Sequence, residues 1–163
     1  MRHHLQACSL TPLKFHHIGI GTAAFEDAIG VYIDLGYELI ESMDDHVLDV
    51  RIAFLRGGEG PFIEIVAPLG PNGPLKSLQS RRLLPSPYHT CYETADLVAA
   101  VEYIQNKGFI PLGEPRPALA FGGALIAYFY HRATGMLELV ENPPTWPITA
   151  NPWCPNVVHR RAS

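Results

Sequence analysis

The feature that most constrains the fold of this chain is an internal repeat with an offset of 72 residues. A strand-like run around His17 is followed by a helical pattern and by Gly36, and the same order recurs around His89 and Gly108. His89 follows His17 by 72 residues, and Gly108 follows Gly36 by the same interval. A chain with two such halves is expected to fold as two modules of similar structure.

Each half predicts the order strand, helix, strand, strand, strand. In the first half we expect a helix over 25–35 that ends at Gly36, because glycine readily adopts the left-handed conformation that closes many helices. Two strands, over 50–55 and 62–67, are separated by a glycine-rich turn. In the second half the corresponding helix and strands are expected over 97–107, 108–112, 124–130 and 136–141.

Length and composition fit one compact domain. The chain has 163 residues, of which 47% are hydrophobic and 17% charged, which is enough apolar material for a core. We expect an N-terminal arm over 1–13, a domain over 14–142 and a proline-rich C-terminal tail over 143–163. The domain divides into module one over 14–68, a linker over 69–87 with a short helix over 75–83, and module two over 88–142.

Charge and cysteine content exclude several classes of protein. A formal net charge of −4 lacks the clustered basic charge that nucleic-acid binding needs, so no nucleic-acid partner is expected. The longest apolar stretch, over 118–130, is shorter than the about 20 residues of a transmembrane helix, so no membrane partner is expected. Three scattered cysteines suit neither a disulfide framework nor a thiolate zinc site, and they predict a cytoplasmic location.

Four polar residues lie at equivalent positions of the two halves. His17 and His89 belong to the first strand of each half, whereas Glu64 and Glu138 interrupt the apolar last strands. A carboxylate in such a strand is expected to be paired, protonated or bound to a cation, because burying an unpaired charge is costly. Packed about a pseudo-twofold axis, the four side chains would form a mixed nitrogen and oxygen site for one divalent ion, either Ni, Co, Mn, Zn or Fe.

The strands that carry these four residues resemble the vicinal oxygen chelate superfamily of glyoxalases, bleomycin resistance proteins and dioxygenases. The resemblance rests on FHHIGI, FIEIVAP, YHTCYE and LELVE, which begin at residues 15, 62, 88 and 137, and it covers about residues 14–142. Within the superfamily, the chain looks most like methylmalonyl-CoA epimerase and glyoxalase I. The resemblance implies an α+β fold, in which two βαβββ modules form a half-open barrel around a metal site, and a homodimer.

The resemblance also implies an activity. It predicts a divalent-metal-dependent isomerase or lyase that moves a proton next to a carbonyl through a metal-stabilised enolate, with a small acyl or hydroxy-carbonyl compound as substrate. The family's metal ligands carry over onto His17, Glu64, His89 and Glu138. Its acid/base role carries over onto Glu138, and Glu64 is a second acid/base on the other face of the substrate. His16 is expected on the opposite face of its strand, outside the ligand set.

Three further residues are predicted to contact the substrate. Arg116 is the strongest candidate for contact with an anionic group of the substrate, and Cys91 and Phe62 are expected to line the pocket.

Two other functions stay open. One is an iron dioxygenase of the same superfamily, against which the extra carboxylate at Glu64 counts. The other is a protein that binds a drug or natural product without catalysis.

Overall fold

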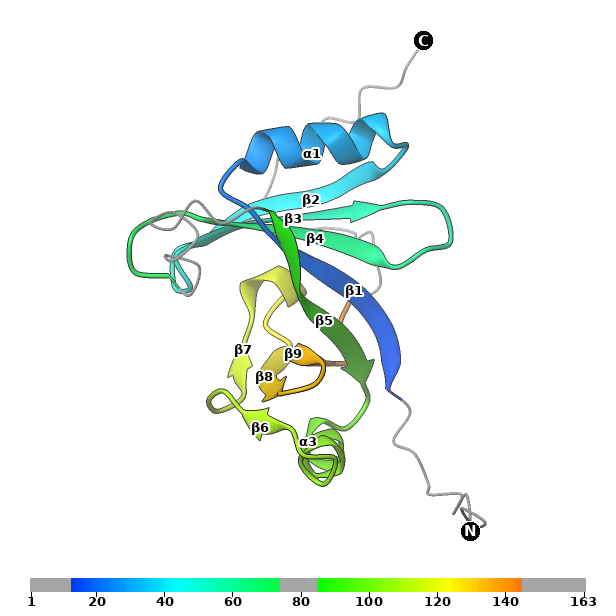
Figure 1. Cartoon of the computed structure of the whole chain (residues 1–163), viewed down its shortest axis with the longest axis vertical. Helices are drawn as coiled ribbons and strands as arrows, with labels where there is room; N and C mark the ends of the chain where they lie inside the picture. The colour runs from blue at the N-terminus through cyan, green and yellow to red at the C-terminus, as the bar shows by residue number, and fades with distance from the viewer. Residues whose placement is uncertain (1–12, 74–84, 145–163) are drawn as a thin grey trace.

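The computed structural model describes residues 13–73 and 85–144 (Figure 1). The expected helix over 75–83, almost all of the N-terminal arm and almost all of the proline-rich tail lie outside the described residues, so the domain boundaries stay a prediction. In the described part of the chain, no helix is long and apolar enough to cross a membrane.

Helices and strands follow the order expected for both halves, except that the second half has two additional short elements, β7 and η1. The helices are α1 (Phe25–Asp34), α3 (Leu97–Gln105) and a short 3₁₀ helix, η1 (Leu119–Phe121). The strands are β1 (Lys14–Gly21), β2 (Glu38–Asp45), β3 (Val50–Arg56), β4 (Phe62–Pro68), β5 (Ser86–Thr94), β6 (Ile110–Pro111), β7 (Arg116–Pro117), β8 (Leu125–His131) and β9 (Gly135–Glu141).

The strands form one sheet in the order β2-β3-β4-β1-β5-β9-β8-β6, with β7 paired to β8. β1 runs parallel to β4, β5 runs parallel to β9, and β1 and β5 meet antiparallel between the two halves. The same pairing therefore recurs on each side of the β1–β5 pair. The sheet curls into a half-barrel (Figure 1), which confirms the α+β fold of two similar halves.

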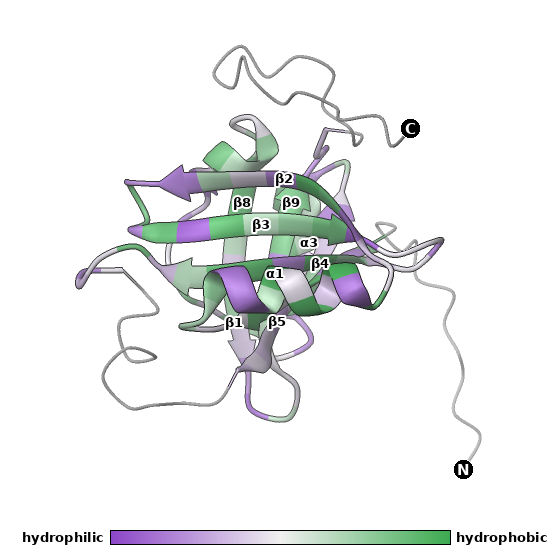
Figure 2. Cartoon of the chain, turned by 90° about the horizontal axis from the view of Figure 1, so that it is seen from above, coloured by the Kyte–Doolittle hydropathy of each residue, from purple (hydrophilic) through white to green (hydrophobic). Residues whose placement is uncertain are grey.

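Successive side chains along each strand point alternately to the inside and to the outside of the half-barrel. On β4, Ile63 and Ile65 pack against α1, which lies over this part of the sheet (Figure 2). On β9, Leu137 and Leu139 belong to the buried cluster under α3. The residues between them, among them Glu64 and Glu138, therefore face the inside of the half-barrel.

The predicted helix ends are confirmed at both glycines. Gly36 and Gly108 have φ angles of +91° and +92°, and each follows the last turn of its helix. At the start of α3, the Asp96 carboxylate accepts a hydrogen bond of 2.9 Å from the backbone N–H of Ala99. Glycine is favoured where φ is positive, because a Cβ atom is strained there.

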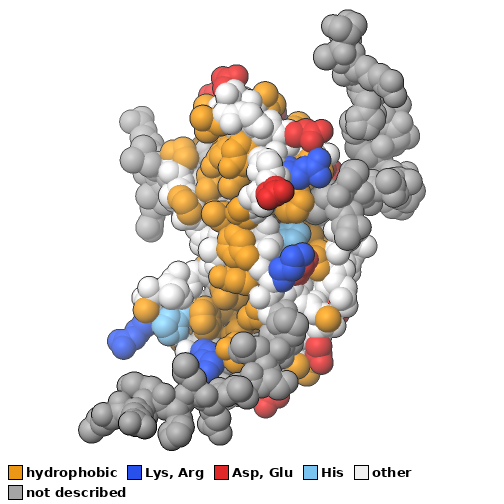
Figure 3. All heavy atoms as spheres, turned by 90° about the vertical axis from the view of Figure 1, so that its right-hand side faces the viewer, with side chains coloured by type: hydrophobic (Ala, Val, Ile, Leu, Met, Phe, Trp, Pro, Cys, Tyr) orange, Lys and Arg blue, Asp and Glu red, His pale blue; other side chains and the backbone are white. Residues whose placement is uncertain are grey.

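Hydrophobic side chains also reach the surface. A band of them crosses the face seen in Figure 3, with basic and acidic groups beside it. Val31, Ile33 and Leu35, at the end of α1, are each about half exposed or more. The homodimer implied by the resemblance stays a prediction.

Gly19 lies in the middle of β1, where two strands approach it. It pairs with Glu64 of β4 on one side and with His89 of β5 on the other. A Cβ atom on residue 19 would collide with the His89 ring. In contrast, a Cβ atom on Gly30, which lies on the exposed side of α1, would have nothing within 4 Å. The absence of a side chain at Gly19 therefore makes room for the imidazole of His89.

We expect Gly19→Ala to lower the free energy of unfolding by about 1–3 kcal/mol, because the His89 ring and β1 must move apart. The control, Gly30→Ala, is expected to raise it by about 0.5–1 kcal/mol, since alanine loses less backbone entropy in a helix. Chemical denaturation measures both changes. A Gly19→Ala protein as stable as the wild type would contradict the close packing of His89 over β1.

Candidate metal centre and adjoining cavity

The sheet brings the four predicted ligands together from four strands. Glu64 on β4 and His89 on β5 both pair with Gly19, so they approach each other across β1. His17 on β1 and Glu138 on β9 both pair with a central residue of β5, and they approach each other in the same way. Because of the repeat in the sequence, the four side chains therefore lie close together in the structure.

The four side chains form a compact cluster inside the half-barrel. The Nε2 atoms of His17 and His89 are 2.9 Å apart. Glu64 Oε2 lies 3.3 Å from each of these nitrogens, and Glu138 Oε2 lies 3.3 Å from His17 Nε2 and 3.2 Å from His89 Nε2. None of the four residues is more than 5% exposed. Two imidazoles and two carboxylates therefore share one buried space.

This spacing fits a single divalent ion. Two ligand atoms that each lie about 2.1 Å from one ion, at right or tetrahedral angles, are about 3.0–3.4 Å apart. The five distances above run from 2.9 to 3.3 Å. Within the described residues, Glu64 Oε2 and Glu138 Oε2 make no hydrogen bond of acceptable geometry, although both atoms are buried. Unsatisfied buried carboxylate oxygens are expected where a cation completes the site.

Electrostatics in the cluster balance the two carboxylates with a proton on His17. Burial alone would lower the pKa of His17, but the Glu64 and Glu138 carboxylates outweigh it and raise this pKa from 6.5 to about 9. Burial would raise the pKa of Glu138, but the neighbouring imidazoles hold it well below its usual range. In the metal-free protein, His17 is therefore an imidazolium at neutral pH.

His16 does not lie on the opposite face of β1, and that expectation is wrong. In the pairing of β1 with β5, Phe15 lies opposite Tyr92 and His17 lies opposite Cys91, so His16 is the extra residue of a β-bulge. A bulge re-aims side chains, and His16 Nδ1 lies 2.8 Å from His17 Nδ1. Burial, followed by the neighbouring His17, lowers the pKa of His16 from 6.5 to about 4. His16 is thus a neutral neighbour of the cluster.

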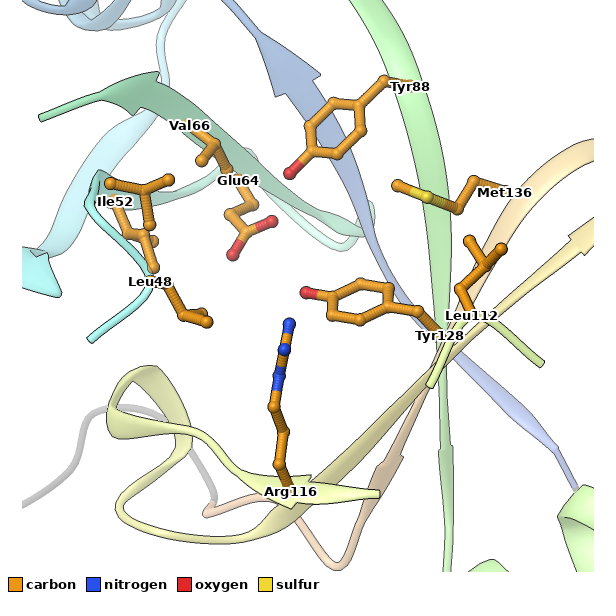
Figure 4. A pocket seen from close by; sticks show the side chains of 10 residues that line it. Leu48, Ile52, Glu64, Val66, Tyr88, Leu112, Arg116, Tyr128 and Met136 are labelled. Carbon is orange, nitrogen blue, oxygen red and sulfur yellow. The ribbon is translucent and has the colours of Figure 1, made fainter. Parts of the chain in front are cut away.

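A cavity of about 330 Å³ opens beside the cluster (Figure 4). Glu64 lines it, whereas Glu138 does not. The side chains of Glu64, Tyr88, Tyr128 and Arg116 point into the same space (Figure 4). The remaining lining is apolar and consists of Leu48, Val50, Ile52, Val66, Leu112 and Met136.

The two tyrosines are site residues that sequence reasoning missed. Burial, reinforced by the nearby carboxylates, raises the pKa of both phenols well above 10, so both stay protonated and available as donors. Tyr88 occupies a second bulge, directly before His89, because the β1–β5 pairing passes from His89 to Pro87. Tyr128 pairs with Glu138 across β8 and β9. The spacing of Tyr88 before His89 repeats that of His16 before His17, which was the available signal.

The three predicted substrate contacts have different surroundings. Arg116, on β7, lines the cavity, and its Cζ atom lies 5.7 Å from the centre of the Tyr128 ring. Cys91 is fully buried under the cluster, where burial raises the pKa of its thiol well above 9. Phe62 lines a different cavity together with His16. Of the three, Arg116 alone faces the space next to Glu64.

Sequence comparison matches the chain to a known family and finds similarity to an epimerase. A model of the Glyoxalase/Bleomycin resistance protein/Dioxygenase superfamily matches residues 16–128. The chain is 25% identical over 118 residues to an ethylmalonyl-CoA/methylmalonyl-CoA epimerase of Cereibacter sphaeroides. That match covers 72% of this chain and 87% of the relative.

Comparison with solved structures finds the same fold. Methylmalonyl-CoA epimerase from Mycobacterium tuberculosis superposes with a TM-score of 0.71 at 26% identity, over 86% of this chain and 95% of that one. A variant of the Streptomyces coelicolor methylmalonyl-CoA epimerase, in complex with 2-nitronate-propionyl-CoA, gives a TM-score of 0.69 at 21% identity. The second match covers 80% of this chain and 98% of that one, and it supports the fold alone.

We expect the binding of one divalent ion at pH 7.5 to release about one proton, because the imidazolium of His17, with its pKa of about 9, must free Nε2 for the ion. Calorimetric titration with zinc in buffers of different ionisation enthalpy measures this number. As the pH rises through 9, His17 loses this proton before the ion binds, so the release is expected to fall towards zero. Zinc binding without proton release at pH 7.5 would contradict the charge balance described here.

Proposed function

We propose that this chain, which belongs to the Glyoxalase/Bleomycin resistance protein/Dioxygenase superfamily, is a divalent-metal-dependent isomerase that moves a proton next to a carbonyl group. The observation that carries the proposal is the buried cluster of two histidines and two glutamates, one of which also lines the adjoining cavity. The epimerases among the similar proteins favour an isomerase over a lyase.

The roles of the two carboxylates follow from where each one lies. A divalent ion held by His17, Glu64, His89 and Glu138 would polarise a substrate carbonyl and acidify the carbon beside it. Glu64 reaches both the cluster and the cavity, so we assign to it the removal of the proton from that carbon. Glu138 is 1% exposed and lies outside the cavity lining, so we assign it to the ligand set alone.

Tyr128 is the group that we assign to the opposite face of the substrate. Glu64 stands on β4 and Tyr128 on β8, in different halves of the half-barrel, and both point into the cavity (Figure 4). The high pKa of the Tyr128 phenol keeps its proton in place until a strong base, such as the substrate carbanion, accepts it. Proton removal by Glu64 and donation by Tyr128 would invert the carbon, and exchange with solvent would restore both groups.

The cavity also suggests the kind of substrate. Arg116 offers a guanidinium for an anionic group, and the walls formed by Val50, Ile52 and Val66 suit a short alkyl substituent. A small acyl compound with a carboxylate and an alkyl group on the carbon next to its carbonyl has both features. Ethylmalonyl-CoA and methylmalonyl-CoA, named for the Cereibacter relative, are therefore the first compounds to test.

We expect the metal-loaded protein to exchange the proton on that carbon for deuterium in D₂O, and to invert the carbon. Glu64→Gln is expected to slow both processes about 100-fold or more, because the amide accepts no proton. Tyr128→Phe is expected to keep the exchange and lose the inversion, since the proton then returns from the Glu64 side. Mass spectrometry and chiral analysis of the two acyl-CoA compounds separate these outcomes.

Exchange that is unchanged in Glu64→Gln would contradict the assigned proton acceptor. If the iron-loaded protein instead consumed oxygen with a catechol and exchanged no proton, the dioxygenase alternative would replace the isomerase.

We expect Arg116→Gln to raise the KM of an anionic substrate about 10- to 100-fold with a small change in kcat, because a hydrogen bond to a charged group is worth about 1.5–3 kcal/mol. Steady-state kinetics with the acyl compound that exchanges fastest measures the change. Arg132→Gln, in the turn between β8 and β9, is the matched control, because this arginine lies outside the cavity lining. Equal KM values for the two variants would contradict the role of Arg116.

A further inference from the structure

We propose that His16 is a positioning residue that fixes which ring nitrogen of His17 carries a proton, and thereby directs the Nε2 lone pair of His17 at the ion. The inference rests on the proposed function, because it concerns how the chain holds the metal. It gives a role to a histidine that belongs neither to the four-residue cluster nor to the lining of the cavity beside Glu64.

The contact between the two histidines is a hydrogen bond between equivalent atoms. His16 Nδ1 lies 2.8 Å from His17 Nδ1, and both rings are buried. Only one hydrogen fits between two nitrogens at this distance, so one ring donates and the other accepts. The two ring planes are inclined at 80°, with their centroids 5.1 Å apart.

Metal binding decides which ring is the donor. If Nε2 of His17 binds the ion, the proton of the neutral ring resides on Nδ1, and His17 donates it to Nδ1 of His16. His16 then carries its own proton on Nε2. A metal-ligating histidine commonly donates its second N–H to a carboxylate, a carbonyl or water, and here a second imidazole takes that place.

Aromatic packing holds the acceptor in place. The His16 ring lies 5.3 Å from the centre of the Phe62 ring and 5.7 Å from the centre of the Phe121 ring. Phe121 also lies beside His17, with ring centroids 6.0 Å apart. The bulge on β1 brings His16 next to His17, and the two phenylalanines pack against its buried ring.

The second half of the chain provides an internal comparison. The bulge residue before His89 is Tyr88, whose side chain lines the cavity. Among the described residues, Nδ1 of His89 has no hydrogen-bond partner. The residues of the two equivalent bulges thus have different roles. His16 holds a ligand, whereas Tyr88 faces the substrate space. Of the two ligand histidines, His17 is therefore the one whose Nδ1 atom has a hydrogen-bond partner among the described residues.

A second metal ion is the competing explanation of this contact. His16, His17 and Cys91 also lie close enough together to share an ion. An ion at Nδ1 of His17, in addition to one at Nε2, would require this ring to lose both of its protons. A hydrogen bond makes no such demand on the ring, so it is the reading that the geometry favours.

The test compares three substitutions of His16 with zinc as the probe. In His16→Asn the side-chain oxygen reproduces the position of Nδ1 and can accept the bond, whereas in His16→Gln the amide reaches the position of Nε2. His16→Phe keeps a ring and removes the acceptor. His131→Asn, which changes a half-buried histidine at the end of β8, is the control outside the site. Thermal unfolding establishes that each variant is folded.

We expect His16→Phe and His16→Gln to weaken zinc binding about 10- to 100-fold, and His16→Asn to stay within about threefold of the wild type. In ¹⁵N NMR of the zinc-loaded protein, the Nδ1–H signal of His17 is expected to persist in the wild type and in His16→Asn. The same signal is expected to be lost through exchange with water in His16→Phe.

The outcomes separate this inference from the proposed function. Equal zinc affinity in all variants, with the His17 Nδ1–H signal unchanged, would overturn the role of His16 and leave the metal site intact. A wild-type protein that binds no zinc would overturn both proposals. Two zinc ions per chain, with the second lost in His16→Phe and in Cys91→Ser, would make His16 a ligand and overturn its positioning role.

Discussion

The rest of the site depends on two carboxylates that share a buried space with two imidazoles. Glu64 and Glu138 each place an oxygen within 3.3 Å of both histidine Nε2 atoms, where water does not screen their charge. Such a pair needs positive charge, either from protons or from a cation. The half-barrel supplies the enclosure, and Gly19 supplies the room in which the His89 ring crosses β1. Of the two carboxylates, Glu64 is the one that also lines the adjoining cavity.

The internal repeat explains why the four side chains converge, and departures from the repeat explain why their surroundings differ. The two halves pair their strands in the same way, so equivalent residues meet near the β1–β5 pair. Equivalent positions beside the four side chains carry different residues in the two halves. Gly19 corresponds to Cys91, and His16 corresponds to Tyr88. As a result, His16 contacts the His17 ring in one half, whereas Tyr88 contributes a phenol to the cavity in the other.

The sequence predicts the order of the elements and the convergence of the two histidines and two glutamates. Both predictions are possible because the 72-residue repeat and the apolar alternation can be recognised in the sequence. The place of His16 could not, since a bulge adds a residue to one strand without changing the hydrophobic pattern on either side of it. The strand over 124–130 looked apolar throughout, yet Tyr128 turns its hydroxyl into the cavity. Phe62 was expected to line the pocket, but it lines a cavity other than the one beside Glu64.

The most direct test of the metal centre is the metal content of the protein. Elemental analysis would be made after purification without added metal, and again after incubation with nickel, cobalt, manganese or zinc. A His89→Ala variant treated in the same way is the comparison. The account predicts about one divalent ion per wild-type chain and a strongly reduced content in the variant. No ion in the wild type under any of these conditions would contradict it.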